Sequence, residues 1–195
     1  MTSVTPAVGV GGISIRYAQS VSFNAASTFA YDNFNRANGS LGANWTNLQN
    51  AFSISSNQVA PDNAGIDVAS YTGATFGNDQ TARVTVTTMA GGGNGSGPCV
   101  RLQAGAASGY AGYIDGSNYE ILKLTAGVES VINSGGLTVS APAIVELSVV
   151  GTTLTLTVNG VVIRVSTDST YSSGAPGIWT ETSSTGRFDD FLAWS

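Results

Sequence analysis

The chain has 195 residues, of which 42% are hydrophobic and 10% are charged, and its formal net charge is −5. This length suits one domain, and the abundance of Gly, Ser, Thr and Asn favours short strands and turns over helices. The seven Lys and Arg residues occur singly, so they provide no electrostatic footprint for nucleic acid or an anionic membrane surface, and we expect neither partner. Cys99 is the single cysteine, which excludes an intrachain disulfide and a cysteine-based zinc cluster.

Residues 1–28 predict an N-terminal arm. They are rich in Gly, Ser, Thr and Ala and contain one charged residue, Arg16, but they are more apolar than a solvated linker. The segment is either a flexible leader or an arm that becomes ordered against a partner or against the edge of its own domain. It lacks the charged start and continuous apolar run of a secretory signal, and no stretch of the chain reaches the ~18 apolar residues of a membrane span, so we expect neither. The residues predicted to carry assembly are Val8, Val10, Ile13, Ile15 and Tyr17.

Short runs of alternating apolar and polar residues, separated mostly by Gly, Asn or Asp, predict strands in the next part of the chain. No window shows a sustained apolar spacing of three and four, so we expect almost no helix. The glycine-rich run at 90–98 is interpreted as a long hairpin connection between the strands on either side of it. The predicted strands are 52–60, 65–73, 81–89, 97–105, 108–115 and 118–127.

Residues 143–166 predict a three-stranded meander with two-residue turns at Gly151-Thr152 and Asn159-Gly160. With a side-chain period of two, nine apolar residues fall on one face, and threonines, Val162 and Arg164 fall on the other. One buried and one mostly polar face is the pattern of an antiparallel sandwich. The nine residues are Val145, Leu147, Val149, Leu154, Leu156, Val158, Val161, Ile163 and Val165.

Two stretches near opposite ends of residues 29–195 carry a family resemblance. Asp32-x-Phe34-x-Arg36-Ala37-Asn38-Gly39-x-Leu41-Gly42-x-x-Trp45 and Phe188-Asp189-Asp190-Phe191 resemble the two ends of a concanavalin A-like (laminin G-like) jelly-roll domain. The resemblance implies an all-β antiparallel sandwich over residues 29–195, with the first and last strands paired and Phe34 near Phe191. This fold serves lectins, glycosidases and virion proteins alike, so it does not by itself give the function.

The residues for catalysis are missing or scattered. The chain has no histidine, which excludes Ser-His-Asp and Cys-His arrangements and histidine-based metal sites. A laminarinase-like hydrolase would carry Glu-x-Asp-x-x-Glu on one strand, and no such run occurs. The four glutamates, Glu120, Glu129, Glu146 and Glu181, lie on different predicted strands or turns, so no catalytic pair can be chosen among them. We therefore predict that the chain is not an enzyme.

Two ligand sites are predicted. The resemblance implies a structural calcium ion at Asp190. The alternative, which we favour, is that Asp189 or Asp190 accepts hydrogen bonds from Arg36, Arg187 or backbone N–H groups, and no cofactor is then needed. A glycan would need exposed aromatic rings beside short polar side chains, and Tyr110, Tyr113 and Trp179 are the candidates, each with a structural role as its alternative.

Two functional hypotheses follow. The first is a non-enzymatic structural protein of a bacteriophage particle, a head decoration or tail-surface component, which binds other virion proteins or itself and touches glycans weakly. It accounts for the arm and for the absence of a leader and of catalytic residues, and such domains resemble those of phage and bacterial surface proteins. The alternative is an extracellular carbohydrate-binding module of a secreted bacterial protein.

Overall fold

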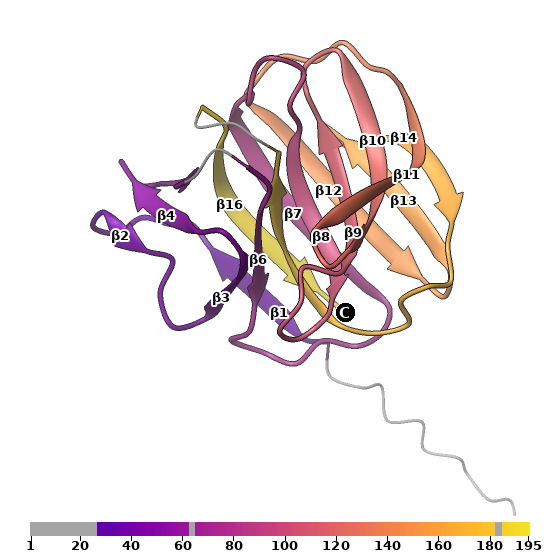
Figure 1. The fold of residues 1–195 in the computed structure, drawn as a ribbon, viewed down its shortest axis with the longest axis horizontal. Helices are drawn as coiled ribbons and strands as arrows, with labels where there is room; N and C mark the ends of the chain where they lie inside the picture. Colours follow the sequence, from indigo (N-terminus) through magenta and orange to yellow (C-terminus); the bar gives the residue numbers. More distant parts are fainter. Residues whose placement is uncertain (1–26, 63–64, 182–184) are drawn as a thin grey trace, which may run out of the picture.

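A computed structural model describes residues 27–62, 65–181 and 185–195. Every regular element in these residues is a strand, and the strands form two antiparallel sheets packed face to face (Figure 1). The predicted all-β sandwich is confirmed. No helix long and apolar enough to cross a membrane occurs in the described ranges. The assembly residues Val8, Val10, Ile13, Ile15 and Tyr17 lie outside these ranges, so the arm, its boundary and its role stay predictions.

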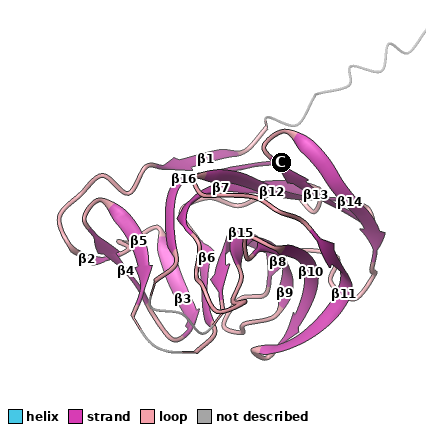
Figure 2. Cartoon of the chain, turned by 90° about the horizontal axis from the view of Figure 1, so that it is seen from above, coloured by secondary structure: helices cyan, strands magenta, loops and turns pink. Residues whose placement is uncertain are grey.

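Sheet A has nine strands and sheet B seven among the described residues, and their layers are seen edge-on in Figure 2. The order in sheet A is β14-β13-β12-β7-β16-β5-β4-β2, with β1 also paired to β16, and the order in sheet B is β11-β10-β9-β8-β15-β6-β3. Sheet A consists of β1 (Phe29–Asp32), β2 (Gly39–Ser40), β4 (Phe52–Ser55), β5 (Gln58–Pro61), β7 (Gln80–Thr88), β12 (Ala143–Val150), β13 (Thr153–Val158), β14 (Val161–Thr167) and β16 (Arg187–Trp194). Sheet B consists of β3 (Trp45–Gln49), β6 (Asp67–Tyr71), β8 (Ser96–Leu102), β9 (Gly109–Ile114), β10 (Asn118–Thr125), β11 (Val128–Gly136) and β15 (Ala175–Thr180).

The first and last described strands pair, as predicted. The register of β1 and β16 places Asp32 opposite Phe191. Phe34 and Phe191 both pack on the ring of Trp45, at centroid distances of 5.7 and 4.7 Å. The two motifs therefore meet in the core between the sheets.

Asp32 explains why the first motif combines an acid, an arginine and a tryptophan. Its carboxylate accepts hydrogen bonds from Arg36 at 2.7 and 2.9 Å and from the indole N–H of Trp45 at 2.8 Å. Burial alone would raise the pKa of Asp32, but the hydrogen bonds from Arg36 and Trp45 outweigh it and lower that pKa. The motif is thus a structural network that fixes the segment between β1 and β3.

The meander is observed with both predicted turns, and most of its predicted core is confirmed. Between β13 and β14 the register shifts at Leu156/Thr157, which places Val165 opposite Thr155 on the polar face and leaves it 54% exposed. Val161, on the edge strand β14, is 61% exposed, so the prediction was wrong for Val161 and Val165. Ile163 is partly buried and packs against the core, as predicted. The buried residues, none more than 4% exposed, are Val145, Leu147, Val149, Leu154, Leu156 and Val158.

Two other strand predictions need correction. The run 52–60 is two strands, because Ser56 and Asn57 adopt left-handed φ angles of 55° and 62° and turn the chain between β4 and β5. The glycine-rich run does connect β7 to β8, but the two strands lie in different sheets. It is a crossover from sheet A to sheet B rather than a hairpin.

Candidate functional site

The aromatic residues predicted to bind glycan are buried. Tyr110, Tyr113 and Trp179 are 0%, 6% and 0% exposed. Tyr110 lies between the sheets, where its hydroxyl donates to Asp168 at 2.7 Å and accepts the backbone N–H of Tyr171 at 2.9 Å. Burial raises the pKa of Tyr110 to about 12. The prediction that these three rings face a sugar is therefore wrong, because none has an accessible face.

Tyr113 and Trp179 belong to a second apolar cluster, on the outer face of sheet B, which points away from sheet A. Their rings stack with centroids 5.1 Å apart and an interplanar angle of 18°. We call this cluster the second core. Its buried members are Val68, Cys99, Leu102, Ala107, Ala111, Tyr113, Leu122, Leu124 and Trp179, with Leu48 and Ile66 packed against them.

The turn between β10 and β11 covers one end of this face. Gly127 in that turn lies against Gln49 of β3, which is the strand at the opposite edge of sheet B. A Cβ atom at Gly127 would lie 1.8 Å from the side-chain oxygen of Gln49, and its φ of 79° also favours glycine. Figure 2 shows β11 turning back toward the β3 side of the molecule. The β10–β11 turn and Gln49 consequently cover part of the outer face of sheet B.

Three of the four glutamates gather beside the second core. Glu120 on β10 lies opposite Tyr113, Glu129 is on β11, and Glu181 follows β15. Burial, and then the charges of Glu181 and Glu120, raise the pKa of Glu129 to about 7, while the indole of Trp179 lowers it. Burial also raises the pKa of Glu120. Sequence reasoning did not group these residues, because they belong to segments that only the pairing and curvature of sheet B bring together.

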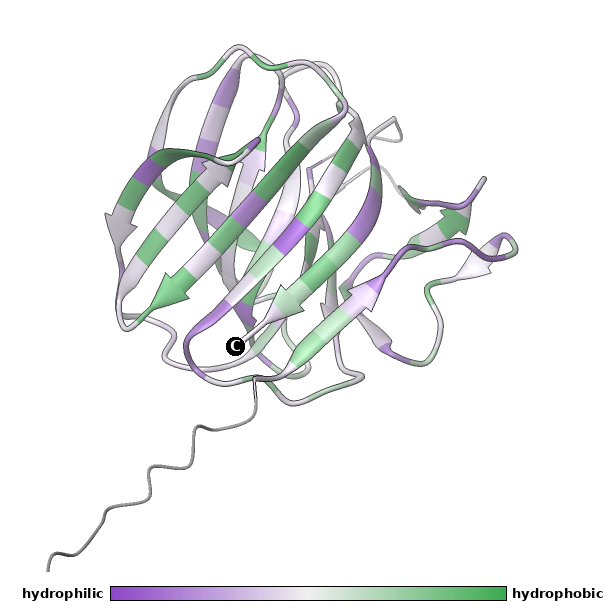
Figure 3. Cartoon of the chain, turned by 180° about the vertical axis from the view of Figure 1, so that it is seen from behind, coloured by the Kyte–Doolittle hydropathy of each residue, from purple (hydrophilic) through white to green (hydrophobic). Residues whose placement is uncertain are grey.

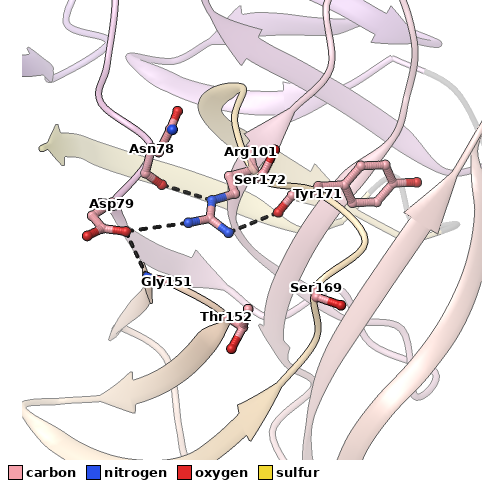
Figure 4. Close-up of a pocket in the computed structure, with 8 residues that line it drawn as sticks. All are labelled: Asn78, Asp79, Arg101, Gly151, Thr152, Ser169, Tyr171 and Ser172. Atoms are coloured by element: carbon pink, nitrogen blue, oxygen red, sulfur yellow. Dashed lines mark hydrogen bonds and ion pairs between the residues drawn. The ribbon is translucent and has the colours of Figure 1, made fainter.

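An open polar cavity lies at one end of the sandwich, where several connections meet (Figure 4). It has a volume of about 480 Å³, within the ~300–1,000 Å³ range of small-molecule sites. We call it the Arg101 pocket. Its residues come from the β6–β7, β12–β13 and β14–β15 connections and from β8, and they are Asn78, Asp79, Arg101, Gly151, Thr152, Ser169, Tyr171 and Ser172.

Arg101 is the buried charge of this pocket. Its guanidinium donates to the backbone carbonyls of Asn78 at 2.8 Å and Tyr171 at 2.9 Å, and it lies 3.5 Å from Asp79. The side chain of Arg101 is 3% exposed, and that of Asp79 is 60% exposed. Arg101 therefore ties two connections together and holds an exposed carboxylate at the mouth of the cavity.

Gln80 makes the same region rigid. Its side-chain amide donates to the carbonyls of Gly77 and Gly174, each at 2.9 Å, and its oxygen accepts the backbone N–H of Arg101 at 3.1 Å. A site whose connections are fixed before binding loses less entropy when a ligand arrives. The pocket is therefore preorganised.

Asp79 gives the pocket its chemistry. One carboxylate oxygen, Oδ1, accepts the N–H of Gly151 at 2.8 Å and also faces Arg101. Both contacts use this oxygen, which leaves Oδ2 as an acceptor for a ligand, and the hydroxyls of Thr152, Ser169 and Ser172 line the same cavity. A carboxylate beside a guanidinium and several hydroxyls suits a ligand with many hydroxyl groups, each of which both donates and accepts.

Asp190 is engaged in hydrogen bonding. Its carboxylate accepts the hydroxyl of Tyr31 at 2.8 Å, and Asp189 accepts the backbone N–H of Asp190 at 2.9 Å. Arg36 pairs with Asp32 and not with these aspartates, whereas the bond from the backbone N–H of Asp190 to Asp189 is one of those that the favoured interpretation predicted. Within the described ranges no group of three or more acidic, His or Cys side chains is arranged to hold a metal. Calcium takes six to eight oxygen ligands, so these residues alone do not fit the ion.

Comparison with known proteins identifies the fold. No protein-family model and no curated protein sequence matches the chain. Among solved structures, carbohydrate-binding module CBM66 from Bacillus subtilis matches with a TM-score of 0.68 and 19% identity, covering 80% of this chain and 99% of that one. A prokaryotic β-1,3-1,4-glucanase (lichenase) from a mouse hindgut metagenome matches with a TM-score of 0.59 and 8% identity, over 86% and 99% of the two chains. The Ca²⁺- and mannose-bound exoplasmic domain of VIP36 matches with a TM-score of 0.54 and 11% identity, over 77% and 82%. The chain has the concanavalin A-like jelly-roll fold of lectins and glucanases.

The residues of the Arg101 pocket were not predicted as a site, although one signal was present. Arg101 is a lone charge inside the mostly apolar run 97–102. A charge that cannot leave a buried strand must find partners, and such partners come from segments distant in sequence. Asp79 and the hydroxyl residues carry no comparable signal, because short polar residues are ordinary in connections.

Proposed function

We propose that the chain is a non-enzymatic glycan-binding module and that the Arg101 pocket is its binding site. The observation that carries the proposal concerns Asp79, whose exposed carboxylate lines the cavity. Arg101 and the N–H of Gly151 fix this carboxylate in position. In this arrangement Asp79 accepts sugar hydroxyls, and the hydroxyl side chains around it complete the hydrogen bonds of the ligand.

The fold comparisons support this class of ligand. The structures that share the fold include a carbohydrate-binding module, a mannose-bound domain and a glucanase. These likenesses favour the carbohydrate-module hypothesis over the virion hypothesis, for which the comparisons contain no support. A glycan-binding module of this kind would act extracellularly, as the alternative hypothesis has it.

The test is binding of the full chain to mannose and β-1,3-1,4-glucan oligosaccharides by isothermal titration calorimetry. Asp79→Ala should weaken binding by about tenfold or more, since a charge-assisted hydrogen bond is worth roughly 1.5–3 kcal/mol. Asp62→Ala is the matched control, because it removes the same charge from an exposed position that does not line the pocket. Equal affinity of Asp79→Ala and the parent chain would exclude this pocket.

Glycoside hydrolysis is the second candidate, because of one observation. Burial raises the pKa of Glu129 to about 7, and this residue lies near Glu120 and Glu181, whereas hydrolases use a carboxyl group with a raised pKa as acid beside a second carboxyl group. Release of reducing sugar from β-1,3-1,4-glucan that disappears in Glu129→Gln would establish this activity. No release from either protein would leave the binding proposal standing.

A further inference from the structure

The outer face of sheet A, which points away from the core and is seen in Figure 3, carries three aromatic side chains outside the Arg101 pocket. Phe29 and Tyr31 on β1 are 63% and 54% exposed, and Trp194 on β16 is partly exposed. Phe29 lies directly opposite Trp194, and Tyr31 shares their face about 7 Å along the strand. The three rings form one patch, which we call the aromatic face.

An ion pair borders the aromatic face. Arg83 on β7 donates to one carboxylate oxygen of Glu146 on β12, at 2.9 and 2.7 Å. The guanidinium carbon of Arg83 also lies 5.3 Å from the ring centroid of Trp194. Arg83 therefore links the ring of Trp194 to the middle of the sheet.

A groove continues the surface beyond this ion pair. It has a volume of about 440 Å³ and follows β7, β12 and the β13–β14 turn. Its residues combine hydrogen-bonding groups with one apolar side chain, and they are Arg83, Ile144, Glu146, Thr157, Asn159 and Gly160. Because Arg83 both lies against Trp194 and lines the groove, the rings and the groove form one elongated surface across sheet A.

The chemistry of this surface favours a long, uncharged, hydroxylated ligand. Arg83 and Glu146 neutralise each other, and the chain has a net charge of −5, so an anionic partner is disfavoured. A sugar ring has an apolar C–H face that packs on an aromatic ring and a rim of hydroxyls for charged and amide groups. The rings and the groove span several strands of sheet A, so they suit an extended chain better than a single sugar residue.

We propose that the aromatic face and its groove bind an extended neutral polysaccharide, as a second glycan surface separate from the Arg101 pocket. The class of ligand rests on the proposed function, whereas the location does not. Chain length separates the two sites: the pocket binds a short oligosaccharide fully, and the long surface adds affinity only for a polymer.

The experiment compares mannan and β-1,3-1,4-glucan with a trisaccharide of each, by affinity electrophoresis for the polymers and calorimetry for the trisaccharides. Tyr31→Ala/Trp194→Ala should weaken polymer binding by about tenfold or more and change trisaccharide binding by less than about twofold. Trp194→Phe alone keeps an aromatic ring at this position, so this variant should retain most of the polymer affinity of the parent chain. Thr85→Ala, on the same face of β7, is the matched control.

The outcomes separate the two proposals. Polymer binding that survives Tyr31→Ala/Trp194→Ala but falls in Asp79→Ala overturns the aromatic face alone, whereas no binding of any probe by the parent chain overturns both. A change of oligomeric state in Tyr31→Ala/Trp194→Ala, seen by sedimentation, with unchanged polymer affinity would assign this face to a second copy of the chain and also overturn the proposal. Circular dichroism of each variant verifies that it is folded.

Discussion

The strands on the two outward faces of the sandwich have the same alternating pattern, but their aromatic side chains differ in solvent exposure. On sheet B, Tyr113 and Trp179 are buried in a second core, whereas on sheet A, Phe29 and Tyr31 remain more than half exposed. The difference comes from how the sheets are covered. The β10–β11 turn reaches Gln49 across sheet B, whereas the aromatic face and the groove of sheet A lie on an open face. Alternation tells which side chains share a face, and the long-range path of the chain decides whether that face meets solvent.

The comparison is tested most strongly by truncating one tryptophan on each outward face. Trp179→Ala should lower the free energy of unfolding by about 3–5 kcal/mol, because the indole is fully buried against Tyr113. Trp194→Ala should cost less than about 1 kcal/mol, since its ring is partly exposed at the sheet surface. Urea denaturation measures both, and similar losses would mean that the two faces are equally covered.

A second pair of substitutions sharpens the comparison within the meander. Leu156→Ala should cost about 2–5 kcal/mol, as truncation of a buried leucine does. Val165→Ala, at a position where the register shift has turned the side chain outward, should cost under about 0.5 kcal/mol. If Val165→Ala lowered the free energy of unfolding as much as Leu156→Ala, the result would contradict the shifted register and support the unshifted pairing of β13 with β14.

The covered face should also make stability depend on pH. The pKa of Glu129 is about 7 in the folded chain, above its ordinary value of 4.5, so the fold binds more protons than the unfolded chain between these values. Its contribution is complete below about pH 4.5 and is lost as the pH rises through 7. Burial also raises the pKa of the fully buried Asp67 to about 7, so this carboxyl acts in the same direction.

Glu129→Gln should therefore reduce the loss of stability between pH 5 and pH 8, measured by urea denaturation at both values. Glu146→Gln is the matched control, since this glutamate pairs with Arg83 on the open face of sheet A. An unchanged pH dependence in Glu129→Gln would show that the covered face does not hold this carboxyl in its protonated form.

The smallest expected effect concerns calcium at the edge of the open face. Removal of calcium with EDTA should move the melting temperature by less than about 2 °C, because Asp190 already accepts the Tyr31 hydroxyl and no metal-holding group surrounds it in the described residues. A larger fall that added calcium reverses, and that Asp190→Asn abolishes, would establish the ion.

Local patterns were sufficient for much of the fold. The alternation in 143–166 and the turn residues at Gly151 and Asn159 predicted both hairpins. They also predicted the pairing of β12 with β13 and, between the turn and Thr157, that of β13 with β14. The shift that exposes Val165 was beyond prediction, because a bulge changes the register without changing the sequence period. The two ends of the jelly roll were identified through Asp32 and the last strand, whose pairing the structure confirms.

The candidate sites were harder to predict because they depend on contacts between distant segments. Asp79 and Arg101 meet across 22 positions, and the glutamates gather only because β11 folds back over sheet B. The aromatic candidates, Tyr113 and Trp179 among them, were chosen by residue type beside short polar side chains, and both are buried, whereas the exposed Phe29 was not considered. Exposure is a property of the assembled sheets, so the choice between these rings needed the structure.

The pairing of β1 with β16 has a mechanical consequence. The backbone N–H of Ser195 donates to the carbonyl of Thr28 at 3.1 Å, and Phe29 lies opposite Trp194, so both ends of the described domain leave at one corner. A force pulling these ends apart would load the hydrogen bonds of the two strands one at a time, as in a zipper, instead of shearing them together. Under tension β1 would peel away first and take Phe29 and Tyr31 with it, while the Arg101 pocket, which has no residue on β1, would keep its shape.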